Sequence, residues 1–273
     1  MFAPLAACFH RFWEWWNSVP SVAQNITYNV IGGILTAIAI SLYWSGSARL
    51  LRRKFRHIFG QTRKSYFLCY GALVLRRELK QLAATNSKDW VNYPLAKRSN
   101  PTLAFSAESA ASACEIRAAS YLSSAIGRDG RLLSEFASDD ELASRLDIDV
   151  ISFGALSNQK TIDLFSNDAN DLAEYDHSKG FFVRKKDTTL LCPPQPNYDY
   201  GMIIKIHPQQ FQKRTWIACA GIGEWGTSGS AWFLANRWKK IEAKVGKKNF
   251  ACVIRVESQK DESATLVFHM YSR

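Results

Sequence analysis

The sequence lacks the residue groupings that hold metal ions or that cross-link small secreted domains. None of its six cysteines forms a Cys-x-x-Cys pair, and none of its five histidines stands at a ligand-like spacing from another histidine or a cysteine. We therefore expect no metal site and no disulfide framework, as in a reducing compartment. Internal repeats and low-complexity tracts are missing too. With 273 residues, 47% of them hydrophobic, the chain can form one main domain with a substantial core.

Charged residues are missing from the whole stretch 15–48. Its centre, 26–44, has the length that one helix needs to cross a hydrocarbon layer of roughly 30 Å. We expect a transmembrane helix over 25–48. A cleaved signal peptide is the alternative, because residues 45–48 are small and would suit a peptidase. The apolar run is long, however, begins late and follows no basic cluster, which favours a retained anchor.

Acidic residues are absent from the next segment, 49–64, which carries seven Lys or Arg residues. These seven account for more than half of the net charge of +11, so the basic character is largely local. The positive-inside rule places this juxtamembrane segment and the following domain in the cytoplasm. Residues 1–24, with Phe and Trp at near-helical spacing, predict an interfacial amphipathic helix in contact with membrane lipid; a merely hydrophobic N-terminus is the alternative.

The expected transmembrane helix has two unlike faces. At about 100° per residue, the small or polar residues Asn25, Asn29, Gly32 and Thr36 share one face, while Ile and Leu residues occupy the other. Unpaired amides are costly in lipid, and one helix cannot shelter its own polar stripe. We therefore expect a homo-oligomer, for example a tetramer, in which the stripe either packs between helices or lines a pore.

Residues 65–273 predict an α/β domain with a Rossmann-like, largely parallel sheet, because strand patterns alternate with helix patterns. Strands are expected over 65–75, 148–153, 202–206, 215–220, 249–258 and 263–272, with a hairpin over 180–193. Helices are expected over 104–126, 141–146, 159–165 and 230–241.

Two strand-to-helix junctions carry the pattern of an anion site. The first has Gly154, Ser157 and Asn158; the second has Gly221, Gly223 and Gly226 in a Gly-x-Gly-x-x-Gly motif, followed by Thr227 and Ser228. Glycines let the backbone approach a ligand, and free N–H groups at a helix start bind phosphate. Because parallel strands end at one edge of a sheet, we expect both junctions to bind one ligand with several phosphates. Close helix–sheet packing is the alternative role for the glycines.

A nicotinamide dehydrogenase is disfavoured. Its fingerprint opens the domain and is followed about 20 positions later by an acidic residue. Here the acid of the next strand, Glu257, lies 31 positions after Gly226, and only 47 residues follow that glycine. A hydrolytic enzyme would need a general acid or base near the bound sugar. The candidate acids are Asp199 and Glu224 near the loops, and Glu108 and Glu115 on the expected helix over 104–126. None has an identifiable partner, so no catalytic residue and no cofactor is assigned.

The run from Gly221 to Thr227, after an apolar strand and opening a helix, resembles the glycine–threonine loop of the LOG/SLOG Rossmannoid superfamily. That group includes nucleotide-processing glycosidases and non-catalytic nucleotide sensors. The enzymes carry a glutamate three positions after the threonine, where this chain has Ser230. The resemblance therefore implies a sensor, and Arg117, Arg184, Lys185 and Arg214 would add positive charge if they reach the cleft.

A sensor domain behind one membrane helix is similar to the membrane effectors of bacterial antiphage signalling, in particular the channel effectors of the Hailong system. The similarity implies an ion channel in the bacterial inner membrane that acts in antiviral defence. It also implies gating by a nucleotide or oligonucleotide second messenger from a partner nucleotidyltransferase. A membrane-anchored nucleotide- or NAD-processing glycohydrolase and an anchored scaffold protein are the alternatives.

Overall fold

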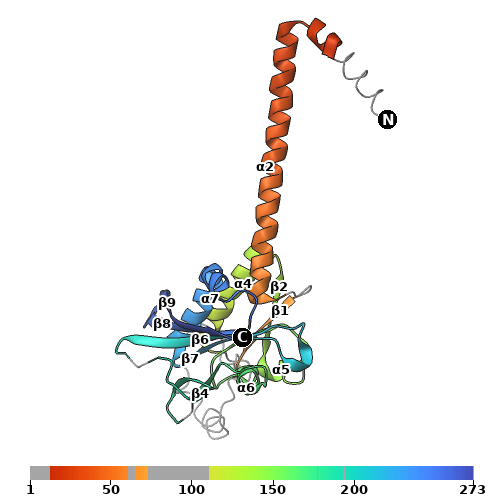
Figure 1. Cartoon of the computed structure of the whole chain (residues 1–273). Coiled ribbons are helices and arrows are strands. Elements are labelled where there is room, and N and C mark those ends of the chain that lie inside the picture. Colours follow the sequence, from red (N-terminus) through yellow and green to blue (C-terminus); the bar gives the residue numbers. More distant parts are fainter. Residues whose placement is uncertain (1–12, 61–64, 73–110, 177, 193–194, 273) are drawn as a thin grey trace, which may run out of the picture. The chain divides into compact units, whose positions relative to one another are not determined.

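The computed structural model describes residues 13–60, 65–72, 111–176, 178–192 and 195–272. The chain divides into two compact units, Met1–Leu51 and Arg52–Arg273. In its described part, the first unit holds a short helical stretch over 13–18 and most of the long helix α2 (Ser21–Phe59). The last two turns of α2 belong to the second unit, and Figure 1 labels the elements of both.

Helix α2 is long and apolar enough to cross a membrane, and its apolar window is not buried within the protein. The helix continues without a break through the expected membrane segment, the small residues 45–48 and most of the basic segment. Half of the amphipathic helix expected over 1–24, residues 1–12, lies outside the described residues; the described half is helical over 13–18 and from Ser21 onward.

The second unit is built on a seven-stranded mixed sheet with the order β2-β1-β3-β7-β6-β8-β9. Strands β1 (Ser65–Tyr70), β2 (Leu133–Ser138), β3 (Val150–Phe153) and β7 (Trp216–Gly221) form a parallel half. Strands β6 (Tyr198–Ile206), β8 (Phe250–Glu257) and β9 (Lys260–Tyr271) form an antiparallel half that joins β7 through β6.

The expected α/β class and parallel strands are therefore present, and the antiparallel half is an addition to them. Short connections explain it, because a parallel crossover needs a dozen or more residues. β8 and β9 are joined by Ser258 and Gln259 alone, and Gln259 has a positive φ of 68°.

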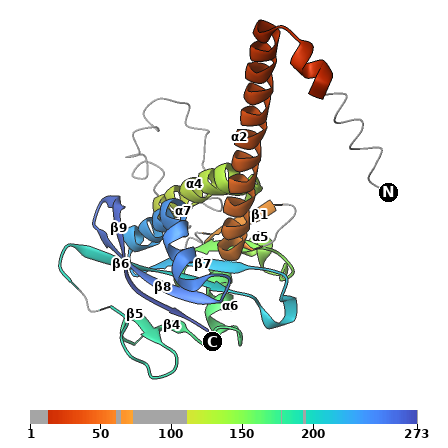
Figure 2. The same ribbon diagram turned by 45° about the horizontal axis from the view of Figure 1, so that its top comes forward.

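Helices cover both faces of the sheet (Figures 1 and 2). α4 (Ala113–Ala125) and α7 (Glu224–Val245) lie side by side on one face. α5 (Asp139–Leu142), α6 (Gln159–Ser166) and the hairpin of β4 (Ala173–Asp176) and β5 (Phe181–Arg184) lie on the other. Successive residues of a strand point to opposite faces of the sheet, and helices or the hairpin cover both faces. Nearly every residue of β6 and β7 is therefore buried, and both strands are near-continuous apolar runs.

Several element boundaries differ from those expected. The last helix begins at Glu224, six residues before the expected start. β5 pairs with the upstream strand β4. Downstream, where the hairpin over 180–193 was expected, it forms an isolated bridge between Val183 and Leu190 and two backbone hydrogen bonds, Arg184 to Thr189 and Leu191 to Phe182. β2 was not expected, because four of its six residues are at least partly exposed and show no clear alternation. Residues 73–75 and 104–110 of the expected elements lie outside the described residues.

Candidate ligand-binding site

The glycine motif lies where β7 passes into α7. Gly221 is the last residue of β7, and Gly223 is the N-cap of α7. Gly226, Thr227 and Ser228, expected at the start of a helix near residue 230, lie inside the first two turns of α7. The amides of Gly223 and Gly226 are therefore among the donors that a helix start leaves without an intrahelical partner.

Close packing against neighbouring backbone requires glycine at two positions of the motif, Gly221 and Gly226, and at Gly201 in β6. A Cβ atom on Gly226 would overlap the carbonyl oxygen of Tyr200, and one on Gly201 would overlap the carbonyl oxygen of Gly226. A Cβ atom on Gly221 would overlap the amide nitrogen of Thr227. Glycine at these positions thus lets α7 start directly against β6 and turn tightly out of β7, with or without a ligand.

The amide donors of the α7 start already bind an anion, the side chain of Asp199. One carboxylate oxygen accepts hydrogen bonds from the amides of Gly223 (3.0 Å) and Tyr200 (2.7 Å), and the other accepts from the amide of Gly226 (2.7 Å). Asp199 lies near the start of β6, beside β7, and is half-buried. The geometry of an anion site is therefore present at this loop, with a carboxylate of the chain itself in place.

Thr227 and Ser228 are buried and engaged within the protein. The Thr227 hydroxyl lies 3.5 Å from the carbonyl oxygen of Gly223, and the Ser228 hydroxyl contacts the carboxylate of Asp261. Arg117 donates to both Asp261 (3.2 Å) and Ser228 (3.3 Å) and lies 4.3 Å over the ring of Trp225. Arg117 thus lies next to the α7 start, where its charge is balanced by Asp261.

At the first junction, Asn158 acts as a helix cap. Its side-chain oxygen accepts from the amide of Lys160 (2.9 Å), and its side-chain nitrogen donates to the carbonyl of Cys69 (2.9 Å). Gly154 has a positive φ of 84°, which favours glycine. The Ser157 hydroxyl donates to Glu115 (3.3 Å). These residues join the end of β3 to the end of β1 and start α6.

Two buried carboxyl groups, Glu115 and Asp139, complete this junction. Glu115 accepts from the amide of Gly71 (3.0 Å), and Asp139 accepts from the amides of Ala72 (2.9 Å) and Gln159 (2.8 Å). Burial is the main reason that the pKa of Glu115 is raised to about 7, and the nearby charge of Asp139 also raises it. The ends of β1 and β3 form the switch point of the sheet, where α/β proteins commonly bind ligands.

Of these two carboxyls, the sequence indicated only Glu115, and only as a weak candidate. Its signal is a single acid in a helix of small residues that packs on the sheet. Asp139 had no signal, because β2, which it follows, was not expected. Glu108 lies outside the described residues.

The two junctions are adjacent, since the amide of Gly154 donates to the carbonyl of Cys219 in β7 (3.2 Å). At both helix starts, carboxylates of the chain take amide donors that would bind phosphate. The hydroxyl groups of a ligand could donate hydrogen bonds to these carboxylates as they stand. A phosphate would compete with the carboxylates for the same amides and would have to displace them. Among the described residues, no three His, Cys, Asp or Glu side chains are grouped so as to hold a metal ion.

The other basic residues considered for the site bind elsewhere. Arg184 pairs with Asp187, and Lys185 donates to the carbonyl of Phe165 (2.7 Å). Arg214 pairs with Asp147 and precedes β7, so it lies at the opposite end of this strand from the glycine loop.

Helix α7 connects the glycine loop to the end of α2. Trp238 in α7 meets the ring of Phe55 edge-on, with centroids 5.2 Å apart, and Glu242 lies 2.9 Å from the imidazole of His57. From β6, the buried ammonium group of Lys205 donates to the carbonyl of His57 (2.6 Å). The last turns of α2 are therefore part of the core of the second unit.

The four polar or small residues of α2 are exposed. The hydroxyl of Thr36 donates to the carbonyl of Gly32 (2.8 Å), a bond that satisfies it within the helix. Within the described part of the chain, the side chains of Asn25 and Asn29 make no hydrogen bond. These two amides would need partners in a membrane.

Comparisons of the chain with protein-family models, with curated proteins and with solved structures give no match. The similarity to the LOG/SLOG group and to antiphage membrane effectors therefore depends on the glycine loop and on the order of the helix and the α/β domain.

Proposed function

We propose that the protein is an oligomeric effector of the bacterial inner membrane whose cytoplasmic α/β domain binds a nucleotide or oligonucleotide second messenger. Binding opens an ion channel formed by the transmembrane helices and serves antiviral defence. The observation that supports this most is the course of α7. One helix starts at an anion-binding loop and packs its C-terminal half against the end of α2.

In this proposal, a phosphate of the ligand takes the place of the Asp199 carboxylate at the amides of Gly223 and Gly226. A helix start favours either anion, so the exchange keeps both donors and the helix dipole satisfied. Displaced Asp199 would have to move away from α7 together with its part of β6. A ligand that binds this second arrangement better shifts the balance between the two, and α7 passes the change to α2.

The decisive experiment is ATP binding by the full-length protein in lipid nanodiscs, measured by calorimetry. Asp199→Asn should bind ATP about tenfold more tightly than the wild type, a gain of roughly 1.4 kcal/mol, because the competing negative charge is removed. Asp187→Asn, which changes an exposed carboxyl outside the loop, is the matched control. Mass spectrometry of molecules retained by the wild type would identify its own ligand. If no nucleotide is retained and neither protein binds ATP, the proposal is wrong.

The channel part is tested separately in reconstituted bilayers with ligand present. Asn29→Leu and Thr36→Leu should change ion flux and leave nucleotide binding intact, because they alter only the polar face of α2. Leu35→Ile on the apolar face is the control. Equal flux in all three variants and the wild type would count against a pore and leave helix packing as the role of the stripe.

One observation favours a second candidate function, a membrane-anchored nucleotide- or NAD-processing glycohydrolase. Glu115 is 3% exposed at the switch point, and its pKa of about 7 suits a general acid at neutral pH. This function predicts release of nicotinamide from NAD or adenine from ATP, abolished in Glu115→Gln. Absence of release by the wild type would exclude both reactions for this protein.

A further inference from the structure

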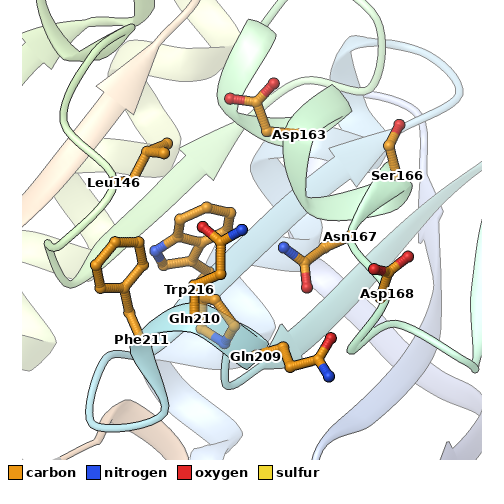
Figure 3. A pocket seen from close by; sticks show the side chains of 10 residues that line it. Leu146, Asp163, Ser166, Asn167, Asp168, Gln209, Gln210, Phe211 and Trp216 are labelled. Atoms are coloured by element: carbon orange, nitrogen blue, oxygen red, sulfur yellow. The ribbon is translucent and has the colours of Figure 1, made fainter.

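A pocket of about 320 Å³ lies at the edge of the sheet opposite the glycine loop (Figure 3). Its lining includes Trp216, the first residue of β7, whereas Gly221 at the glycine loop is the last. The other walls come from α6, from the residues that follow it, and from the connection between β6 and β7. The pocket shares no residue with the proposed nucleotide site, so an inference from it goes beyond the proposed function.

Apart from Gln210, whose amide is drawn beside the indole of Trp216 in Figure 3, the apolar and polar side chains of the lining lie on different sides of the pocket. Figure 3 shows Phe211 and Leu146 on the same side as the indole of Trp216. Asn167 and Asp168 lie on the other side, together with further hydroxyl, amide and carboxyl groups. A ligand that fills this space needs an apolar face and an edge that forms hydrogen bonds.

The charge of the lining disfavours an anion. It contains Asp163 and Asp168 and no Lys or Arg. Asp163 accepts from the side chain of Gln159 (2.9 Å) and lies 3.8 Å from the ammonium group of Lys160, which offsets its charge. Asp168 has no side-chain hydrogen bond among the described residues, so its carboxylate remains available to hydroxyl donors.

Local hydrogen bonds hold the walls in place. The indole N–H of Trp216 donates to the carbonyl of Ile148 (3.1 Å), and the residue is only 4% exposed, so it forms part of the floor of the pocket. Phe211 lies in a tight turn, where its amide donates to Pro208 (3.0 Å). The side-chain oxygen of Asn167 accepts from the amide of Ala169 (3.0 Å), and its amino group has no partner in the described part of the chain. Small-molecule sites are typically preformed pockets in which a few polar groups are available to bind the ligand.

We propose that this pocket binds an uncharged saccharide. The C–H face of a sugar ring packs against Phe211, above the floor to which Trp216 contributes, and its hydroxyl groups donate to Asp168 and accept from the amino group of Asn167. The volume is near the lower end of the range for small-molecule pockets, about 300–1,000 Å³. We therefore take the ligand to be of disaccharide size rather than a long chain.

The test is saturation-transfer NMR on the full-length protein in lipid nanodiscs, with maltose, lactose and cellobiose as probes and adenosine as the comparison. At least one disaccharide should bind, and Phe211→Ala and Asp168→Ala should each weaken binding at least tenfold. Gln212→Ala, an exposed neighbour of Phe211 outside the lining, should bind as the wild type does.

The unfolding midpoint of each variant shows whether it remains folded, and Asp168→Ala, at an exposed position, keeps the test valid if Phe211→Ala unfolds. No disaccharide binding at millimolar concentration overturns the proposal. Binding that both variants retain overturns it as well. Binding of adenosine alone, lost in the variants, would replace the saccharide by a nucleoside. ATP binding at the glycine loop should be the same in both variants, so failure here is distinct from failure of the proposed function.

Discussion

The starts of α6 and α7, at the carboxyl ends of the parallel strands, both have their amides bound by side chains of the protein, but these side chains differ in burial. At α6, Asn158 is fully buried and Asp139 is 8% exposed, and both bind amides of the first turn. At α7, the amides are bound by Asp199, which is half-buried and comes from a neighbouring strand. An anion-binding geometry is therefore common to both, and the two differ in how easily the resident carboxylate can leave.

This difference assigns them different roles. The α6 start joins β1 and β3 within the core, so it maintains the fold. At the α7 start the carboxylate of Asp199 is less buried than Asn158 and Asp139, and α7 continues to Phe55 and His57 at the end of α2. The proposed function requires a bound carboxylate that is not deeply buried and a helix in contact with α2. Of the two helix starts, only that of α7 has both properties.

The largest effect is expected at the contact between α7 and β6. Gly226→Val should lower the free energy of unfolding by about 3 kcal/mol, because the new side chain overlaps the carbonyl of Tyr200. Gly127→Ala, where a Cβ atom meets nothing within 4 Å, is the control and should be close to neutral. Urea denaturation measures both. A loss below 1 kcal/mol for Gly226→Val would mean that the contact is looser than described.

At the sealed α6 start, Asn158→Ala should cost about 2 kcal/mol, because it removes a helix cap and leaves the buried carbonyl of Cys69 without its donor. Asn236→Ala changes an exposed asparagine on α7 and should cost less than about 0.5 kcal/mol. Equal costs for the two variants in thermal or urea unfolding would contradict a structural role for the α6 start.

The same junction should give a pH dependence of stability. The pKa of Glu115 is about 7 in the folded protein, above its ordinary value of 4.5, so the folded state keeps a proton that the unfolded state releases. This contribution is complete below about pH 4.5 and is lost as the pH rises to 7, which should lower stability by about 2 kcal/mol between pH 5 and pH 7. Urea unfolding of Glu115→Gln over this range should lack that decrease; a parallel decrease in both proteins would assign it to other groups.

The smallest stability effect is expected at the α7 start. Asp199→Asn keeps one side-chain oxygen as an acceptor and should cost less than about 1 kcal/mol, well below the cost of Asn158→Ala. Thermal unfolding of the two variants side by side tests the comparison. A cost above 2 kcal/mol for Asp199→Asn would show that Asp199 is as structural as Asn158.

The sequence was sufficient for the α/β class, the long apolar helix and most of the strands, because apolar runs and glycine punctuation are local signals. The strand β2 was missed because its side chains are largely exposed. The antiparallel half was missed because it depends on the position of β6 between β7 and β8, and apolar runs do not show strand order. The glycine motif correctly located a strand-to-helix turn. Binding of a ligand phosphate at that turn stays a prediction. Asp199 was named from the sequence as an acid near the loops, but only as a candidate general acid or base. Its role as acceptor of the α7 amides could not be predicted, because Asp199 is 24 residues before Gly223 and reaches it through the strand pairing of β6 with β7.

The relay from the glycine loop to α2 is tested most directly by hydrogen exchange on full-length Asp199→Asn in nanodiscs, with and without ATP. We expect ATP to change amide protection both in the first turns of α7 and in residues 52–59 at the end of α2. A change confined to the glycine loop, with identical exchange over 52–59, would contradict it.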